Sequence, residues 1–293
     1  MEHIARYAPA KINLTLDVLG LRADGFHDIE SVMLQIDLCD IVRVTRSEAG
    51  ILVNTNHPGL PGGPDNLAWR AAALVCSKYG ISSGVVIDID KRIPLAAGLA
   101  GGSTDAAAVL HCMNRLFKLR LDDRELHRMA LELGSDVPFC LDGPAAIATG
   151  RGEILEPVRP GVQLPLLLVN PGFPVSTGQV YRLLDENPPQ AHPDTRAVAA
   201  ALAAGEVHGI ASQLGNVMEP VTMGMHPALS RIKARLQSLS ALGVLMSGSG
   251  PTLFSVFSDR AAAERAAQSI KSDYPTVAVS DSRQGDEDLW IDV

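Results

Sequence analysis

Three strands are predicted in the first part of the chain, two of them from alternating residue types. Between residues 10 and 18, apolar side chains at even positions alternate with polar ones at odd positions. Because a strand points successive side chains to opposite faces, this segment is expected to be a half-buried strand with one polar face. Residues 31–44 and 85–89 predict two further strands. Asp24 and Gly25 predict a turn between the first two.

Apolar residues spaced three and four apart predict helices between these strands and after them. The stripe over residues 67–75 predicts a helix that Asp65 caps and Gly80 ends. Another helix is expected to start at Asp122, with Glu125 at capping-box spacing. The same periodicity predicts helices in these places: after residue 102, after Ser176, after His226 and over residues 262–270.

The second half of the chain predicts a smaller sheet. Leu164–Val169 is a continuous apolar run, which is typical of a buried strand. Two apolar segments, residues 242–246 and 252–257, flank a turn of serines and glycines, and a last strand is expected near Val277. We call residues 247–251 the serine–glycine turn.

Length and punctuation together favour two domains. Single cores stop growing at roughly 250–300 residues, so the 293 residues leave both one and two domains open. Glycine and proline become frequent over residues 151–165. We therefore place a boundary there and predict domains over residues 1–155 and 156–293, with an α+β fold class.

The charge balance and the hydropathy limit the classes of partner expected for this chain. Lys and Arg number 25 against 33 Asp and Glu, which gives a net charge of −8. Nucleic-acid-binding proteins are usually basic, so nucleic acid is not an expected partner. No apolar run approaches the ~20 residues of a membrane span, and residues 1–4 do not open a signal peptide. We expect no membrane partner and a cytoplasmic location.

The cysteines agree with a reducing compartment. There are four, at positions 39, 76, 112 and 140, and none forms a C-x-x-C pair. Such wide spacing argues against a disulfide framework or a zinc site and favours buried, reduced thiols.

A loop of small residues connects the strand at 85–89 to the next helix. Glycines let backbone N–H groups approach a phosphate, and the helix start adds about half a unit of positive charge. No lysine follows as in a Walker A motif, and the spacing is not that of the Rossmann fingerprint. Phosphate binding and a flexible connection are both open. We call this segment the glycine loop; it comprises Pro94, Leu95, Ala96, Ala97, Gly98, Leu99, Ala100, Gly101, Gly102, Ser103 and Thr104.

Three other segments carry candidate chemistry, each with a plainer alternative. Lys11 and Asn13 share the polar face of the first strand, where the lysine is either solvated or holds an anion or an acceptor hydroxyl. Asp136 lies at a turn, where it either caps backbone groups or acts as an acid–base group that the following apolar residues desolvate. The serine–glycine turn is either a simple hairpin or closes over the glycine loop.

Together these segments resemble the GHMP small-molecule kinases, which include galactokinase and the homoserine and mevalonate kinases. Three blocks match in the family's order over essentially the whole chain: the N-terminal strand block, Pro94–Ala107 and Ser247–Pro251. The resemblance implies an N-terminal domain with a mixed sheet and helices, a ferredoxin-like C-terminal domain, and an active site in the cleft between them. It also implies an enzyme that phosphorylates a small alcohol with ATP and Mg²⁺.

Within the family, the likeness is to the branch whose substrate is a cytidine-diphosphate sugar alcohol. The segments that carry this likeness are Ala8–Leu14, Asp24–His27, Asp65–Leu67, Asp90–Pro94 and Gly134–Phe139.

The resemblance implies roles for the matching residues. Asp136 is the general base, and Lys11 is its partner near the acceptor hydroxyl. Asn66 and Lys91 match positions that touch the base of ATP, and the glycine loop wraps the phosphates, with Ser103 or Thr104 as the expected Mg²⁺ contact. The residues expected at the cytidine end are Asn13, Phe26, His27, Thr177 and Tyr181, with the two aromatic rings on either side of the base.

The chain departs from the family pattern at three positions. Phe26 stands where relatives often have tyrosine, so a ring can still stack on cytosine but the phenol hydroxyl is gone. Ala96 and Ala97 stand where relatives often have glycine, and alanine serves there only if the loop needs no positive φ.

Two alternatives to this reading stay open. One is a GHMP kinase for another alcohol such as homoserine or mevalonate, against which residues 26–27 argue. The other is a non-catalytic member that only binds nucleotide, against which Lys11 and Asp136 argue. We expect small-molecule partners and a monomer or weak homodimer.

Overall fold

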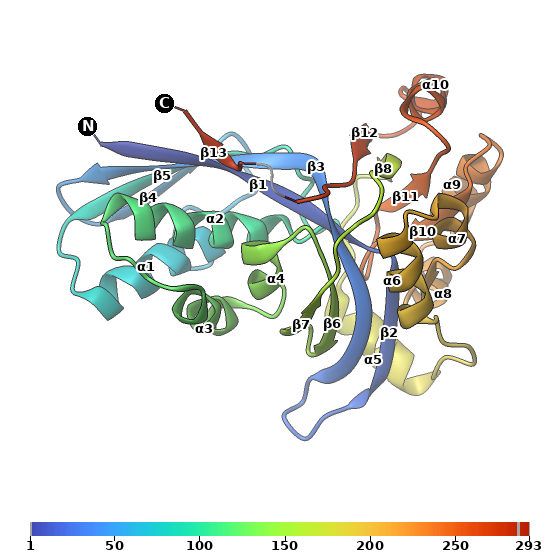
Figure 1. Ribbon diagram of the computed structural model, residues 1–293, viewed down its shortest axis with the longest axis horizontal. Coiled ribbons are helices and arrows are strands. Elements are labelled where there is room, and N and C mark those ends of the chain that lie inside the picture. Colours follow the sequence, from blue (N-terminus) through green and yellow to red (C-terminus); the bar gives the residue numbers. More distant parts are fainter. Residues whose placement is uncertain (1, 286–287, 293) are drawn as a thin grey trace.

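The computed structural model in Figure 1 describes residues 2–285 and 288–292. Within these residues the chain forms a nine-stranded mixed sheet and a four-stranded sheet, each with its own helices. This arrangement confirms the predicted α+β class. No helix of the described residues is both long and apolar enough to cross a bilayer.

The 21-residue strand β3 (His27–Ser47) organises the larger sheet. Its antiparallel partners are β1 (His3–Asn13), β2 (Thr15–Leu21), β5 (Gly84–Asp90) and β6 (Ala145–Gly150). Two further strands extend this sheet: β4 (Ile51–Thr55), parallel to β5, and β7 (Ile154–Pro157), antiparallel to β6.

Four helices of the first half lie together beneath this sheet in the view of Figure 1: α1 (Leu67–Tyr79), α2 (Gly101–Leu116), α3 (Asp123–Leu133) and α4 (Val137–Asp142). The predicted cap of α1 is wrong by one residue, because Asn66 and not Asp65 accepts the Ala68 N–H, at 2.9 Å. The left-handed Gly80 ends α1, and Asp122 caps α3, both as predicted.

The smaller sheet is antiparallel throughout. Its strands lie in the order β10 (Gly243–Met246), β11 (Leu253–Val256), β8 (Pro165–Asn170), β12 (Thr276–Asp281). The helices of this half are α5 (Thr177–Glu186), α6 (Thr195–Ala204), α7 (Val207–Ser212), α8 (Glu219–Met225), α9 (Ala228–Gln237) and α10 (Arg260–Ile270). The sequence predicted α5, α9 and α10 but not α6 to α8, because α6 is alanine-rich and α7 and α8 span only six and seven residues, too few to show a period.

Two short strands from beyond residue 156 join the larger sheet. β9 (Gly215–Asn216) pairs parallel with β2, and β13 (Trp290–Ile291) pairs antiparallel with β1. The two halves of the chain therefore share a sheet, although the domain boundary itself stays a prediction.

The predicted half-buried strand at residues 10–18 is wrong in two respects. The strand is interrupted at Leu14, where β1 ends and β2 begins, and its polar face is buried as deeply as its apolar face. The second half covers that face: Thr15 Oγ1 lies 3.1 Å from Thr195 Oγ1, and Asp17 Oδ1 lies 2.8 Å from His192 Nδ1. A regular alternation indicates a strand but does not show what packs on its polar side.

Candidate active site

A cavity of about 710 Å³, which we call the cleft, lies between the two halves of the chain. Its walls come from β1 to β3, the glycine loop and residues 135–136 on one side, and from α5 and the serine–glycine turn on the other. The predicted residues that line it are Lys11, Asn13, Phe26, His27, Ala96, Gly98, Ala100, Ser103, Asp136, Thr177 and Tyr181.

Lys11 and Asp136 lie together in the cleft. The Lys11 ammonium is buried, donates to Asn13 Oδ1 at 2.9 Å and lies 3.9 Å from Asp136 Oδ2. The Asp136 side chain is 37% exposed and, although it stands at the cap position of α4, makes no capping hydrogen bond. Because the carboxylate is not used to cap the helix, it is available to an acceptor hydroxyl in the cleft.

The polar side chains beneath Lys11 hold it in place. Asn13 Nδ2 donates to Ser31 Oγ at 2.7 Å, and Ser31 Oγ donates to the Thr15 carbonyl at 2.5 Å. This chain satisfies the buried groups and aims the ammonium at Asp136, as a positioned cation requires.

The glycine loop leads directly into α2, and the serine–glycine turn packs on it. A Cβ on Gly98 would lie 2.2 Å from the Ser247 carbonyl oxygen, so only glycine fits there. Ser247 Oγ donates back to the Gly98 carbonyl at 2.9 Å. The turn thus closes on the glycine loop, as expected for a functional turn, and the amino end of α2 faces the same cleft as Asp136.

Ala96 does not meet the condition for alanine in this loop. Its φ is +50°, whereas Ala97 is absent from the left-handed positions of the chain. Ala96 therefore holds a conformation that costs alanine about 1–2 kcal/mol.

Replacing Ala96 by glycine is expected to leave stability unchanged or raise it by up to about 1.6 kcal/mol. Relief of strain is opposed by the ~0.4–1 kcal/mol that glycine adds to the freedom of the unfolded chain. Ala97→Gly is the matched control: it removes a buried methyl worth ~0.8 kcal/mol and should lose about 1–2 kcal/mol. Urea unfolding measures both, and equal losses would contradict strain at Ala96.

Asn66 and Lys91, predicted to touch ATP, do not line the cleft. The Asn66 side chain is used in capping α1 and donates to the Pro61 carbonyl at 2.8 Å. The Lys91 ammonium is buried beneath the glycine loop, where it pairs with Asp40 and with Asp105, whose Oδ2 lies 2.8 Å away. Their contact with ATP stays a prediction.

Lys91, Asp40 and Asp105 form a buried charge cluster. Asp40 Oδ1 also accepts the backbone N–H groups of Arg92 and Ile93, at 2.6 and 2.9 Å. Burial raises the pKa of Asp105 despite the opposing effect of Lys91, and one of its oxygens has no hydrogen-bond partner. Burial alone would lower the pKa of Lys91, but the two carboxylates overcome it and raise that pKa. The ammonium therefore stays charged.

Aromatic side chains form part of the cleft lining. The His27 ring stacks on Tyr181 with centroids 4.4 Å apart, and its Nε2 lies 2.8 Å from Asp185 Oδ1. Phe26 is 49% exposed, and the Arg151 guanidinium lies over its ring at 4.6 Å. Phe26 and Tyr181 are the two rings expected on either side of the base, and each already has a side chain against one face.

Sequence reasoning missed Arg151 and Asp185. Asp185 follows Tyr181 by four residues on α5, so helical spacing could have indicated it. Arg151 lies after β6 in a turn, and its position over Phe26 depends on the pairing of β6 with β3.

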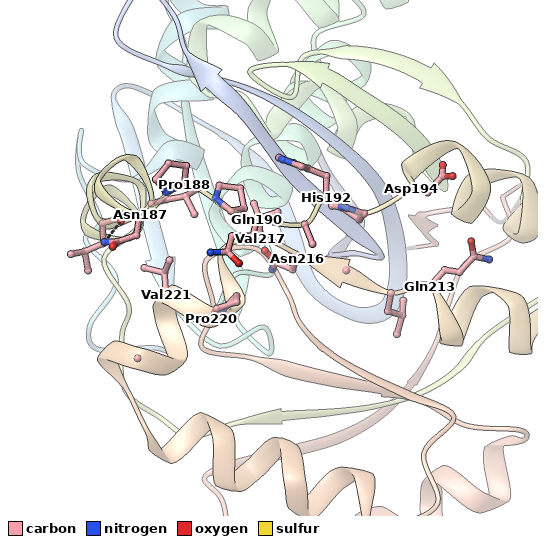
Figure 2. Close-up of a pocket in the computed structure, with 18 of the residues that line it drawn as sticks. Asn187, Pro188, Gln190, His192, Asp194, Gln213, Asn216, Val217, Pro220 and Val221 are labelled. Atoms are coloured by element: carbon pink, nitrogen blue, oxygen red, sulfur yellow. Dashed lines mark hydrogen bonds between the residues drawn. The ribbon is translucent and has the colours of Figure 1, made fainter.

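A larger cavity of about 1080 Å³ lies behind β9 and α8, and we call it the outer cavity. Figure 2 shows residues 187–194 along one side of it, and Asn216, Val217, Pro220 and Val221 along another. No lysine or arginine is among the described residues that line it. A phosphorylated substrate would find no cation there, whereas the cleft offers Lys11, Arg151 and Arg182.

Among residues 2–285 and 288–292, no three His, Cys, Asp or Glu side chains are grouped so that they could hold a metal ion. Oxygen donors do face the cleft, namely the Ser103 hydroxyl and the Asp136 carboxylate. Thr104, the other expected Mg²⁺ contact, is buried and outside the cleft lining.

Known proteins and protein families match most of this chain. Residues 66–144 match the model of the GHMP kinases N terminal domain, and residues 197–276 match that of the GHMP kinases C terminal domain. A 4-diphosphocytidyl-2-C-methyl-D-erythritol kinase of Alkaliphilus metalliredigens is 42% identical over 92% of this chain and 93% of its own. A protein of that name from Syntrophomonas wolfei is 44% identical over 92% of this chain and 95% of its own.

Solved structures agree with the fold. The crystal structure of a 4-(cytidine 5'-diphospho)-2C-methyl-D-erythritol kinase matches with a TM-score of 0.83 at 35% identity, over 96% of this chain and 100% of that one. A homoserine kinase from Cytophaga hutchinsonii matches with a TM-score of 0.75 at 20% identity, over 97% of this chain and 95% of its own, which supports the fold alone.

Proposed function

Because the chain belongs to the GHMP kinase family and is a small-molecule kinase, we propose that it phosphorylates 4-diphosphocytidyl-2-C-methyl-D-erythritol. In this reaction the γ-phosphoryl group of ATP passes to the 2-hydroxyl, a step of non-mevalonate isoprenoid precursor biosynthesis. The observation that supports it most directly is that Asp136, Lys11 and the glycine loop line one cleft together with Phe26 and His27.

The proposed mechanism relies on positioning and charge. Phosphoryl transfer passes through a loose transition state, so little proton removal is needed before the new bond begins to form. Asp136 orients the hydroxyl and takes its proton late, while Lys11 stabilises the oxygen as it becomes negative. Backbone N–H groups of the glycine loop offset the charge on the transferring group.

Mg²⁺ fits the donors present. It usually keeps several waters and binds substrate phosphates, and we propose that the Ser103 hydroxyl, which faces the cleft, contacts it. When bound, Mg²⁺ would stabilise the negative charge of the phosphates.

We also propose a cytoplasmic location, which the four free cysteines support, since thiols stay reduced there. The monomer or weak homodimer stays a prediction.

The proposed function is tested by incubating purified protein with ATP, Mg²⁺ and each of three alcohols. We expect ADP release with the diphosphocytidyl substrate and none with homoserine or mevalonate. Turnover of either other alcohol at higher kcat/KM would assign the chain to another branch of the family. ATP binding without turnover of any alcohol would favour a non-catalytic member.

Phe26→Ala is expected to raise KM for the diphosphocytidyl substrate and to leave KM for ATP unchanged. A base stacked on an aromatic ring gains about 1–3 kcal/mol, which corresponds to about a fivefold to hundredfold rise in KM. The control is Ile154→Ala, since Ile154 is also an exposed large apolar side chain but lies outside the cleft lining. Steady-state kinetics with each substrate varied measures both. Equal KM changes for the two substrates would remove Phe26 from the cytidine end.

A further inference from the structure

We propose that Asn216 is a positioning residue that holds the serine–glycine turn against the glycine loop, whose Leu99 carbonyl accepts the Lys11 N–H at 3.1 Å, and that it thereby sets the geometry of phosphoryl transfer. The proposal deepens the kinase function proposed above and rests on it. Asn216 contacts neither proposed substrate site directly, because it lines the outer cavity and not the cleft.

The backbone around Asn216 is tied to the strand that continues from the acceptor site. β9 pairs in parallel with β2: Gly215 N–H donates to the Leu14 carbonyl at 3.3 Å, and Val217 N–H donates to the Leu16 carbonyl at 3.0 Å. Leu14 directly follows Asn13, the residue that holds the Lys11 ammonium. Asn216 therefore moves with the segment that places Lys11.

The side chain of Asn216 is tied to the serine–glycine turn instead. Its Nδ2 donates to the Met246 carbonyl and to the Gly248 carbonyl, each at 2.8 Å, and its Oδ1 accepts the Met218 N–H at 2.9 Å. The residue is only 7% exposed. Three of the four hydrogen bonds that an amide can make are thus formed, which fixes its orientation.

The serine–glycine turn, held by Asn216, in turn contacts the glycine loop. Gly98 of the glycine loop lies against the Ser247 carbonyl so closely that no Cβ fits between them, and Ser247 Oγ donates to the Gly98 carbonyl. A continuous chain of contacts therefore runs from β2 through Asn216 and the serine–glycine turn to the glycine loop.

The outer cavity makes this connection vulnerable. Asn216 lies in the wall of that cavity, close to Val217 and Pro220 (Figure 2). If the amide is removed, the Met246 carbonyl of β10 and the Gly248 carbonyl of the turn each lose a donor, next to an open space of about 1080 Å³.

Asn216→Ala is expected to lower kcat by about 10- to 100-fold with little change in either KM. A misplacement of about 1 Å can cost 10²-fold in rate, while each substrate keeps the residues that bind it. Asn216→Asp separates hydrogen bonding from packing, because aspartate has the same shape but turns an acceptor oxygen toward two carbonyls. It should lose at least as much kcat as alanine, whereas a packing role predicts a nearly normal enzyme.

Two further variants make the test decisive. Asn187→Ala removes another amide of the outer cavity, whose Nδ2 donates to the Leu183 carbonyl of its own helix, and should keep wild-type kinetics. Thr222→Val removes a 3.2 Å hydrogen bond to the Ser249 carbonyl of the same turn. It should lower kcat by a smaller factor, and it serves as the test if the Asn216 variants fail to fold.

Kinetics are measured well below the Tm of each variant, which thermal unfolding gives, and this excludes a loss of folded protein as the cause. Unchanged kcat in both Asn216→Ala and Thr222→Val, or parallel rises in KM instead, would overturn the role of Asn216. If the wild type itself does not turn over the diphosphocytidyl substrate, the proposed substrate is wrong; the variants are then compared on whichever alcohol the wild type phosphorylates.

Discussion

Asp136→Asn is expected to lower kcat by about 10²–10⁴, the usual contribution of a positioned acid–base group. The asparagine amide keeps the size of the side chain but cannot accept the hydroxyl proton. It also removes the negative charge that faces the Lys11 ammonium at 3.9 Å. KM for ATP should change little, because the glycine loop supplies the phosphate contacts.

The measurement is steady-state ADP release under saturating substrates, with Asp142→Asn as the control. Asp142 ends the short helix α4 that starts beside Asp136, but its carboxylate pairs with His127, 2.7 Å away, and lies outside the cleft lining. The control should keep wild-type kcat. An Asp136→Asn enzyme with more than half of wild-type turnover would exclude Asp136 as the general base.

Lys91→Met is expected to destabilise the protein by about 3–5 kcal/mol, the usual cost of removing one partner from a buried ion pair. The Lys91, Asp40 and Asp105 side chains are all at most 2% exposed. Without the ammonium, two carboxylates face each other with no water to screen them. Urea unfolding measures the loss, and activity need not be assayed.

The pH dependence has a definite sign. Burial already raises the pKa of Asp105 in the folded protein, and loss of Lys91 raises it further, since an opposite charge is removed. At pH values between the unfolded and the folded pKa of Asp105, the folded variant therefore binds more protons than the unfolded chain. Stability falls as pH rises through that window, so the deficit of Lys91→Met should be larger at pH 8 than at pH 5.5.

Two further variants check the cause. Lys78→Met removes a partly exposed lysine, 3.4 Å from Glu125 and 3.6 Å from Glu132. It should lose about 1 kcal/mol or less, as surface pairs do. The double variant Lys91→Met/Asp105→Asn should regain part of the loss. A Lys91→Met protein with normal stability but weak ATP binding would contradict a structural role and favour the predicted contact with the ATP base.

Local patterns were enough to predict the elements that form from neighbouring residues. The alternation at residues 85–89 predicted a strand, which the structure has as β5. The small residues of the glycine loop predicted a junction between strand and helix, and α2 begins there. The turn and the apolar residues after it marked Asp136 as a candidate, but this local pattern left capping and acid–base chemistry both open, and only the family resemblance implied the role of general base.

Features that depend on distant pairs could not be predicted. The partners of Lys91 lie 51 and 14 residues away, and nothing at position 91 indicates that its ammonium points inward and not toward a ligand. Asn216 lies in a two-residue strand without a period, and its role depends on carbonyls 30 and 32 residues further on. Likewise, burial of the polar face of β1 and β2 required the second half of the chain.

The joining of β9 and β13 to the larger sheet has a consequence for how the chain is made. During synthesis on the ribosome, β1 and β2 emerge early, yet their outer neighbours are encoded only at residues 290–291 and 215–216. Until then, both strands carry unpaired backbone groups on those sides, and open edges of this kind readily pair with other chains. The nascent chain therefore keeps an open strand edge on β2 until residues 215–216 have left the ribosome, and one on β1 until residues 290–291 have done so.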